Sequence, residues 1–156
     1  MANLEPLIQS IPVAPLKLAS LEGCRTLADQ VNNYLVSFRH ESPTNVGQAD
    51  SLQGYCADSY LLECECPRFG SGEGKGVLKE SVRGCDLFIM VDVTNYSLTY
   101  RVNGYENHMS PDNHYQDLKR IISAADGKAR RINVIMPFLY EGRQHKRSKR
   151  ESLDCA

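Results

Sequence analysis

Apolar residues along the chain gather in short runs that predict β-strands. Two runs have few polar breaks, Asp86–Val93 and Arg131–Phe138, which is typical of strands covered on both faces of a parallel sheet. A shorter run, Pro15–Ser20, predicts the first strand of the chain. The segment Tyr60–Phe69 alternates between apolar and polar residues, so it predicts a strand with two different faces.

Two further segments repeat apolar residues at intervals of three and four, which predicts amphipathic helices. The first helix begins near Ser20 or Glu22 and ends near His40. Its predicted buried face consists of Leu27, Ala28, Val31, Tyr34 and Leu35.

The second helix begins at Ser110-Pro111-Asp112, which supplies a cap, a first-turn proline and an acid at the N-terminus. Gly127 predicts its end. Its apolar stripe consists of Tyr115, Leu118, Ile121, Ile122 and Ala125. The order strand, helix, strand predicts an α/β domain with a mainly parallel sheet flanked by helices.

Three segments lack a regular pattern. Glu41–Asp58 and Asn95–Asn107 predict surface loops inserted between core elements. Gly70–Gly76 (GSGEGKG) predicts a turn, because no Lys-Ser or Lys-Thr follows at the offset that a phosphate-binding Walker loop requires.

The length of 156 residues suits one domain. A formal net charge of -1, from 18 basic and 19 acidic residues, argues against bulk electrostatic binding to nucleic acid or to a membrane. No stretch has the length needed to span a bilayer, and the N-terminus has no secretory pattern.

The six cysteines are therefore expected to be reduced thiols in a cytoplasmic protein. Cys64 and Cys66 fall on one strand face, where core packing is favoured over zinc binding because no second pair follows.

The segment Arg143–Arg150 holds five basic residues and no acid, directly after a predicted strand. Ligands of open α/β sheets bind at the carboxyl ends of the strands, so this loop is placed to hold an anion such as phosphate. A solvated basic surface or a localisation patch explains the same run, and binding of RNA or DNA is a third interpretation. His145 is interpreted as a loop residue, because no partner lies at metal-ligand spacing.

Three segments occur in a characteristic order. They are Arg68–Glu73 (RFGSGE), Glu80–Ile89 (ESVRGCDLFI), and Pro137-Phe138 followed by Arg143-Gln144 and Arg150-Glu151. Together they resemble the ribose-phosphate pyrophosphokinase family, also called phosphoribosyl pyrophosphate synthetases. The family pattern is Arg-Phe-Ser-Asp-Gly-Glu, then Val-Arg-Gly-x-Asp-Val-Phe, then Pro-Tyr with Ala-Arg-Gln-Asp-Arg-Lys and a later Arg-Glu-Pro.

The resemblance implies an incomplete phosphoribosyltransferase-like N-terminal domain over residues 1–156. For the full-length parent it implies transfer of pyrophosphate from ATP to ribose 5-phosphate in nucleotide biosynthesis, with Mg²⁺ bound alongside ATP. It also implies a homo-oligomer, because the two ATP loops often meet across a subunit boundary, and it assigns no catalytic or metal-binding residue to this chain. The ATP-binding residues that it implies are Phe69, Ser71, Glu73, Arg143, Gln144 and Arg150.

The chain departs from the family pattern at several positions: His145 stands where the family has Asp, Gly142 replaces Ala, Ser152 replaces the Pro of Arg-Glu-Pro, and the loop between Arg143 and Arg150 is one residue short. Ser71 stands where the family has Asp, and the Asp-Thr-Gly-Gly-Thr loop of the family's second domain does not occur. We therefore expect the N-terminal, ATP-contributing part of such an enzyme, inactive by itself. The alternative is a non-catalytic regulatory homologue that binds nucleotide or a synthetase subunit.

Overall fold

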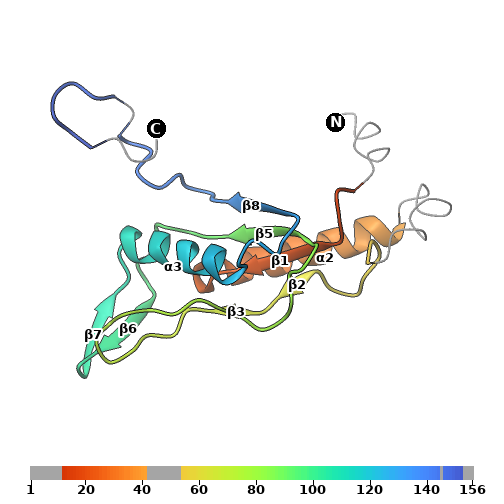
Figure 1. The fold of residues 1–156 in the computed structure, drawn as a ribbon, viewed down its shortest axis with the longest axis horizontal. Helices are drawn as coiled ribbons and strands as arrows, with labels where there is room; N and C mark the ends of the chain where they lie inside the picture. The colour runs from red at the N-terminus through yellow and green to blue at the C-terminus, as the bar shows by residue number, and fades with distance from the viewer. Residues whose placement is uncertain (1–11, 42–53, 145, 153–156) are drawn as a thin grey trace.

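The computed structural model describes residues 12–41, 54–144 and 146–152. Its centre is a sheet of four parallel strands in the order β2-β1-β5-β8 (Figure 1). The strands span Leu16–Ser20 (β1), Leu61–Leu62 (β2), Asp86–Met90 (β5) and Arg131–Ile135 (β8). The predicted α/β class with a mainly parallel sheet is confirmed.

The two α-helices of the described residues cover opposite faces of this sheet. A 3₁₀ turn, η1 (Glu22–Cys24), leads into α2 (Arg25–Glu41), which connects β1 to β2, while α3 (Pro111–Ala124) connects β5 to β8. The chain moves from β1 outward to β2 on one side of the sheet and from β5 outward to β8 on the other side. Because both crossovers are right-handed, their helices lie on opposite faces. The carboxyl ends of β1 and β5 therefore form the switch point of the sheet.

The core consists of two clusters, one on each face of β1 and β5. Ala19 and Ile89 belong to the cluster that includes Leu118 and Ile121 of α3. Their sequence neighbours Leu18 and Met90 point to the opposite face of the sheet, where they pack with Ala28 of α2. Strand β5 is buried on both faces over most of its length, as predicted, because it has a strand on each side and helices above and below.

Strand β8 is less covered than its apolar sequence predicts. Val134 is 42% exposed, and the burial of β8 on both faces is therefore a wrong prediction. The physical reason is that β8 lies at the edge of the described sheet, outside the central strands β1 and β5 on which the helices pack. Its first residue is instead held by charge, since the Arg131 guanidinium donates to both carboxylate oxygens of the buried Asp86 at 2.9 and 2.5 Å.

Helix α2 has the predicted extent, but its buried face is rotated. Leu27 and Tyr34 were expected inside and are 40% and 66% exposed. Asn32 takes an inward position instead, because its side-chain oxygen accepts a hydrogen bond from the backbone N–H of Tyr60 at 2.8 Å. Ala28, Val31 and Leu35 pack in the core as predicted.

Helix α3 begins and ends as predicted. The Ser110 hydroxyl caps it by accepting from the backbone N–H of Asn113 at 3.2 Å. The chain leaves the helix after Ala124 through Asp126 and Gly127, which both have positive φ. Tyr115 and Ile122 pack at the edge of the core, and Leu118, Ile121 and Ala125 are buried.

The alternating segment Tyr60–Phe69 forms two short strands in different sheets. Its first part is β2, and its second part is β3 (Cys64–Glu65), which pairs with β4 (Val77–Leu78) in an antiparallel hairpin. The predicted face is confirmed, because Leu62 and Cys64 are buried and Cys66 packs against the same cluster.

The segment Asn95–Asn107, predicted as a loop, instead contains most of a second β-hairpin. Strands β6 (Thr99–Val102) and β7 (Tyr105–His108) pair in antiparallel fashion beyond one end of α3 (Figure 1). Their turn is Asn103-Gly104 with φ values of 51° and 85°, as two-residue hairpin turns require. Most of the other predicted loop, Glu41–Asp58, lies outside the described residues.

Candidate functional site: two loops anchored on helix α3

The first candidate loop is the tip of the β3–β4 hairpin. Its backbone is closed by three hydrogen bonds: Phe69 N to Glu73 O at 2.8 Å, Gly72 N to Phe69 O at 2.9 Å, and Lys75 N to Pro67 O at 3.0 Å. Gly72 has a φ of 90°, a conformation open to glycine at little cost. The Arg-Phe-Gly-Ser-Gly-Glu segment is therefore a defined turn.

The side chains at this tip face solvent. Phe69 is 56% exposed although it is a large apolar residue. The Ser71 hydroxyl donates to the Glu73 carboxylate at 2.8 Å, which braces that carboxylate. An exposed ring and a braced carboxylate can respectively stack on a base and accept from an exocyclic amine.

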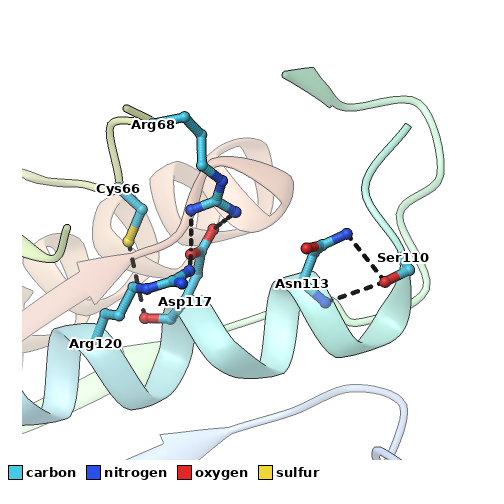
Figure 2. A network of polar contacts seen from close by, with 6 residues as sticks. All are labelled: Cys66, Arg68, Ser110, Asn113, Asp117 and Arg120. Carbon is cyan, nitrogen blue, oxygen red and sulfur yellow. Dashed lines mark hydrogen bonds and ion pairs between the residues drawn. The ribbon is translucent and has the colours of Figure 1, made fainter. Parts of the chain in front are cut away.

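The root of the same loop is buried against α3. Arg68 donates to both carboxylate oxygens of Asp117, at 2.6 and 2.8 Å, and Arg120 donates to one of them at 2.6 Å (Figure 2). The side chains of Arg68 and Asp117 are 8% and 5% exposed. Burial lowers the pKa of Arg68, but the hydrogen bonds and charge of Asp117 outweigh this effect and raise it overall. Arg68 is thus fixed as a cation inside the protein.

The second candidate loop follows β8 and is also tied to α3. The ring of Tyr140 stacks on Tyr115, with centroids 4.1 Å apart, and its hydroxyl donates to Asp112 at 2.6 Å. That hydrogen bond raises the pKa of the Tyr140 phenol far above its ordinary value. A turn at Glu141, with a φ of 53°, then leads the chain away.

The basic segment beyond this turn is mostly exposed. Arg143 and Arg150 are exposed, and Gln144 is partly buried. The Gln144 side-chain oxygen accepts from the Ser152 hydroxyl at 3.3 Å, and this contact joins the two ends of the segment. His145 lies outside the described residues, so the interpretation of it as a loop residue stays a prediction.

Helix α3 holds the two loops apart. Tyr115 and Asp117 are two positions apart on a helix, which separates them by about 200° around its axis. The β3–β4 tip accordingly lies on one side of α3 in Figure 1 and the segment after β8 on the other. Within one chain the structure does not bring Phe69, Ser71 and Glu73 together with Arg143, Gln144 and Arg150.

Cys64 and Cys66 pack in the core of the described chain, as predicted. Cys64 and Cys66 remain free thiols, and no three His, Cys, Asp or Glu side chains in the described ranges gather to hold a metal ion. Burial raises the pKa of Cys64 to about 11 and of Cys66 to about 12. Both residues are therefore thiols, not thiolates, at neutral pH.

These thiols should make the fold sensitive to alkali. From pH 9.0, the ordinary pKa of a thiol, to about 12, the unfolded chain loses protons that folded Cys66 retains, so the free energy of unfolding should fall as pH rises. Urea denaturation between pH 8 and 12 measures this slope. The Cys66→Ala variant should have a shallower slope than the unmodified chain, and equal slopes would contradict the prediction.

The sequence identified both loops but not what holds them. Asp117 and Arg120 were not distinguished from other polar residues of the second helix. Tyr140 and Asp112 lie 28 positions apart, and no local pattern pairs them. The sequence offers one signal for this anchor, which is Arg68, the first residue of the Arg68–Glu73 segment. Its residue type alone does not reveal that it pairs with helix α3.

Comparison with known proteins agrees with this geometry. The sequence pattern of the family described as the N-terminal domain of ribose phosphate pyrophosphokinase matches residues 16–156. Ribose-phosphate pyrophosphokinases of Corynebacterium ammoniagenes and Bacillus cereus are each 30% identical over 135 residues, which is 86% of this chain and 31% of theirs.

A solved structure extends the likeness to the fold. The crystal structure of phosphoribosylpyrophosphate synthetase from Mycobacterium smegmatis matches with a TM-score of 0.56 and 24% identity, over 88% of this chain and 35% of that one. The chain therefore spans about a third of the length of the relatives it matches. Within that span, it belongs to the ribose-phosphate pyrophosphokinase family and corresponds to the family's N-terminal domain.

Proposed function

We propose that this chain is the ATP-contributing N-terminal part of a ribose-phosphate diphosphokinase, an enzyme that transfers pyrophosphate from ATP to ribose 5-phosphate. The observation that carries the proposal is the β3–β4 tip, where a hydrogen-bonded turn carries an exposed Phe69 ring and a Glu73 carboxylate that accepts from the Ser71 hydroxyl. This tip lies within the residues matched by the family pattern.

A complete nucleotide site requires a second copy of the chain under this proposal. The β3–β4 tip, which holds Phe69 and Glu73, lies on one side of α3, and the segment after β8, which holds Arg143, lies on the other (Figure 1). Two copies that place the tip of one beside the basic segment of the other supply both halves. A homo-oligomer is thus part of the proposed function, as is a cytoplasmic location.

Mg²⁺ would be bound together with the ATP phosphates. Protein sites for Mg²⁺ in phosphoryl-transfer enzymes commonly use few carboxylates and rely on substrate oxygens and water. The metal would neutralise phosphate charge, and the role of this chain is to hold the nucleotide.

Replacement of Phe69 tests the nucleotide site. Loss of a stacking ring costs about 1–3 kcal/mol per base, so Phe69→Ala should weaken ATP binding about 5- to 150-fold. Isothermal titration calorimetry with Mg-ATP measures this change. Tyr34→Ala, at an aromatic residue 66% exposed on α2, is the matched control and should leave the affinity unchanged. Equal affinities of the Phe69→Ala variant and the unmodified chain would contradict the proposal.

The alternative is a regulatory homologue that binds nucleotide or a synthetase subunit without catalysis. The replacement of the family Asp by Ser71 favours it, since the hydroxyl here serves to brace Glu73. An AMP-release assay with ATP, Mg²⁺ and ribose 5-phosphate separates the two. An active synthetase whose rate changes on addition of this chain supports the regulator, and an unchanged rate counts against it.

A further inference from the structure

A buried charge cluster lies between α3 and the candidate nucleotide loop. Asp117 receives two hydrogen bonds from Arg68 and one from Arg120, so both of its carboxylate oxygens are engaged (Figure 2). The backbone carbonyl of Asp117 also accepts a weak hydrogen bond from the Cys66 thiol at 3.8 Å. One residue of α3 thus contacts two residues of the segment that leads from β3 into the loop.

This contact controls the loop because of where Arg68 lies in it. Arg68 forms an antiparallel bridge with Gly74, so the pair closes the base of the turn. Phe69 follows Arg68 directly, and its N–H donates to the Glu73 carbonyl. A shift of Arg68 therefore moves the stacking ring and the backbone of the braced carboxylate together.

The β6–β7 hairpin closes over the other side of Arg68. The guanidinium carbon lies 5.2 Å from the centroid of the Tyr100 ring, a distance at which a cation and an aromatic face attract. Val102 of the same strand lies so near Gly72 that a Cβ there would be 3.0 Å from it. The loop is held between α3 and the hairpin.

Buried ion pairs rarely add stability over apolar residues of the same volume, because both charges lose their water. Their defined geometry makes them suited to fixing one arrangement, and a bidentate guanidinium–carboxylate pair is the most directional of them. A loop that must present an aromatic ring to a ligand gains affinity when it is ordered beforehand.

We infer that Asp117 is a positioning residue that holds the Phe69–Glu73 loop in its nucleotide-binding conformation through Arg68. Asp117 itself does not contact the nucleotide. This inference rests on the proposed function, since the loop is taken as the adenine-binding element. Under this inference Asp117 affects nucleotide binding only through the conformation of the Phe69–Glu73 loop.

The test compares Asp117→Asn with the unmodified chain by amide hydrogen exchange observed by NMR. The amides of Phe69, Gly72 and Lys75 should exchange at least tenfold faster in the variant, because their hydrogen bonds close the loop. Amides of β5 should change less than twofold. Calorimetry should show ATP affinity reduced about tenfold. Arg68→Lys, which keeps the charge but not the paired geometry, should give a smaller change of the same kind.

Asp126→Asn is the control, because Asp126 is exposed and forms a salt bridge with an exposed Lys128. It should alter neither exchange nor affinity. Unchanged loop exchange in both Asp117→Asn and Arg68→Lys would overturn the inference, as would faster exchange spread equally over the loop and β5. Absence of ATP binding by the unmodified chain would contradict the proposed function instead, and loop exchange would still decide the role of Asp117.

Discussion

Replacing Ile89 with alanine should lower the free energy of unfolding by about 2–5 kcal/mol, because it leaves a cavity where no neighbour can collapse. Ile89 is fully buried in the middle of β5, paired with Ala19 of β1 on one side and Val134 of β8 on the other. Its side chain lies in the cluster beneath α3. Urea denaturation followed by circular dichroism measures the change.

The matched control is Val134→Ala, at the register partner of Ile89. Val134 is 42% exposed, so its truncation should cost less than about 1 kcal/mol. Similar losses at the two positions would mean that β8 is covered by further structure in solution. The pair therefore tests the position of β8 at the edge of the sheet.

The existence of the main elements could be predicted from sequence because their signals are local. Strands β1 and β5 follow from apolar runs, and α3 follows from its Ser110 cap and apolar stripe. In each case the pattern is contained in consecutive residues. The hairpin β6–β7 was also recognisable, since Asn103-Gly104 is a strong turn signal, but its strands alternate only weakly and the segment was predicted as a loop.

Burial could not be predicted equally well, because it depends on neighbours far along the chain. The apolar sequence of β8 predicts a strand covered on both faces, yet the sheet order leaves it with one partner strand among the described residues. In α2 the inward position goes to Asn32, because the backbone N–H of Tyr60 requires an acceptor there. The periodicity of apolar residues does not indicate which backbone groups need a side-chain hydrogen-bond partner.

The candidate site shows the same division. The loop around Phe69 was located by its motif, whereas its anchor joins Arg68 to Asp117 across 49 positions. A carboxylate on a helix predicts a solvated surface unless the facing segment is known. The separation of the two loops by α3 is likewise a property of the fold, since it follows from the order of strands and the face that each helix covers.

Gly76, at the end of the β3–β4 tip, packs closely against helix α3. Replacing Gly76 with alanine should destabilise the fold by about 1–3 kcal/mol, the usual cost of forcing extra atoms into a packed site. A Cβ at Gly76 would lie 2.5 Å from the backbone carbonyl oxygen of Arg120 and 2.6 Å from its carbonyl carbon. Helix backbone cannot rotate away as a side chain can, so the hairpin must move off α3.

That movement should also loosen Arg68 from Asp117, so the Gly76→Ala variant should lose ATP affinity together with stability. Urea denaturation and calorimetry with Mg-ATP measure the two effects. Gly70→Ala is the control for stability, because a Cβ at Gly70 meets no atom within 4 Å and the residue does not have a positive φ. Glycine-rich loops often cradle phosphate through their backbone, whereas Gly76 here permits close packing on a helix. Loss of affinity in Gly76→Ala without loss of stability would favour direct ligand contact by this glycine over the packing role.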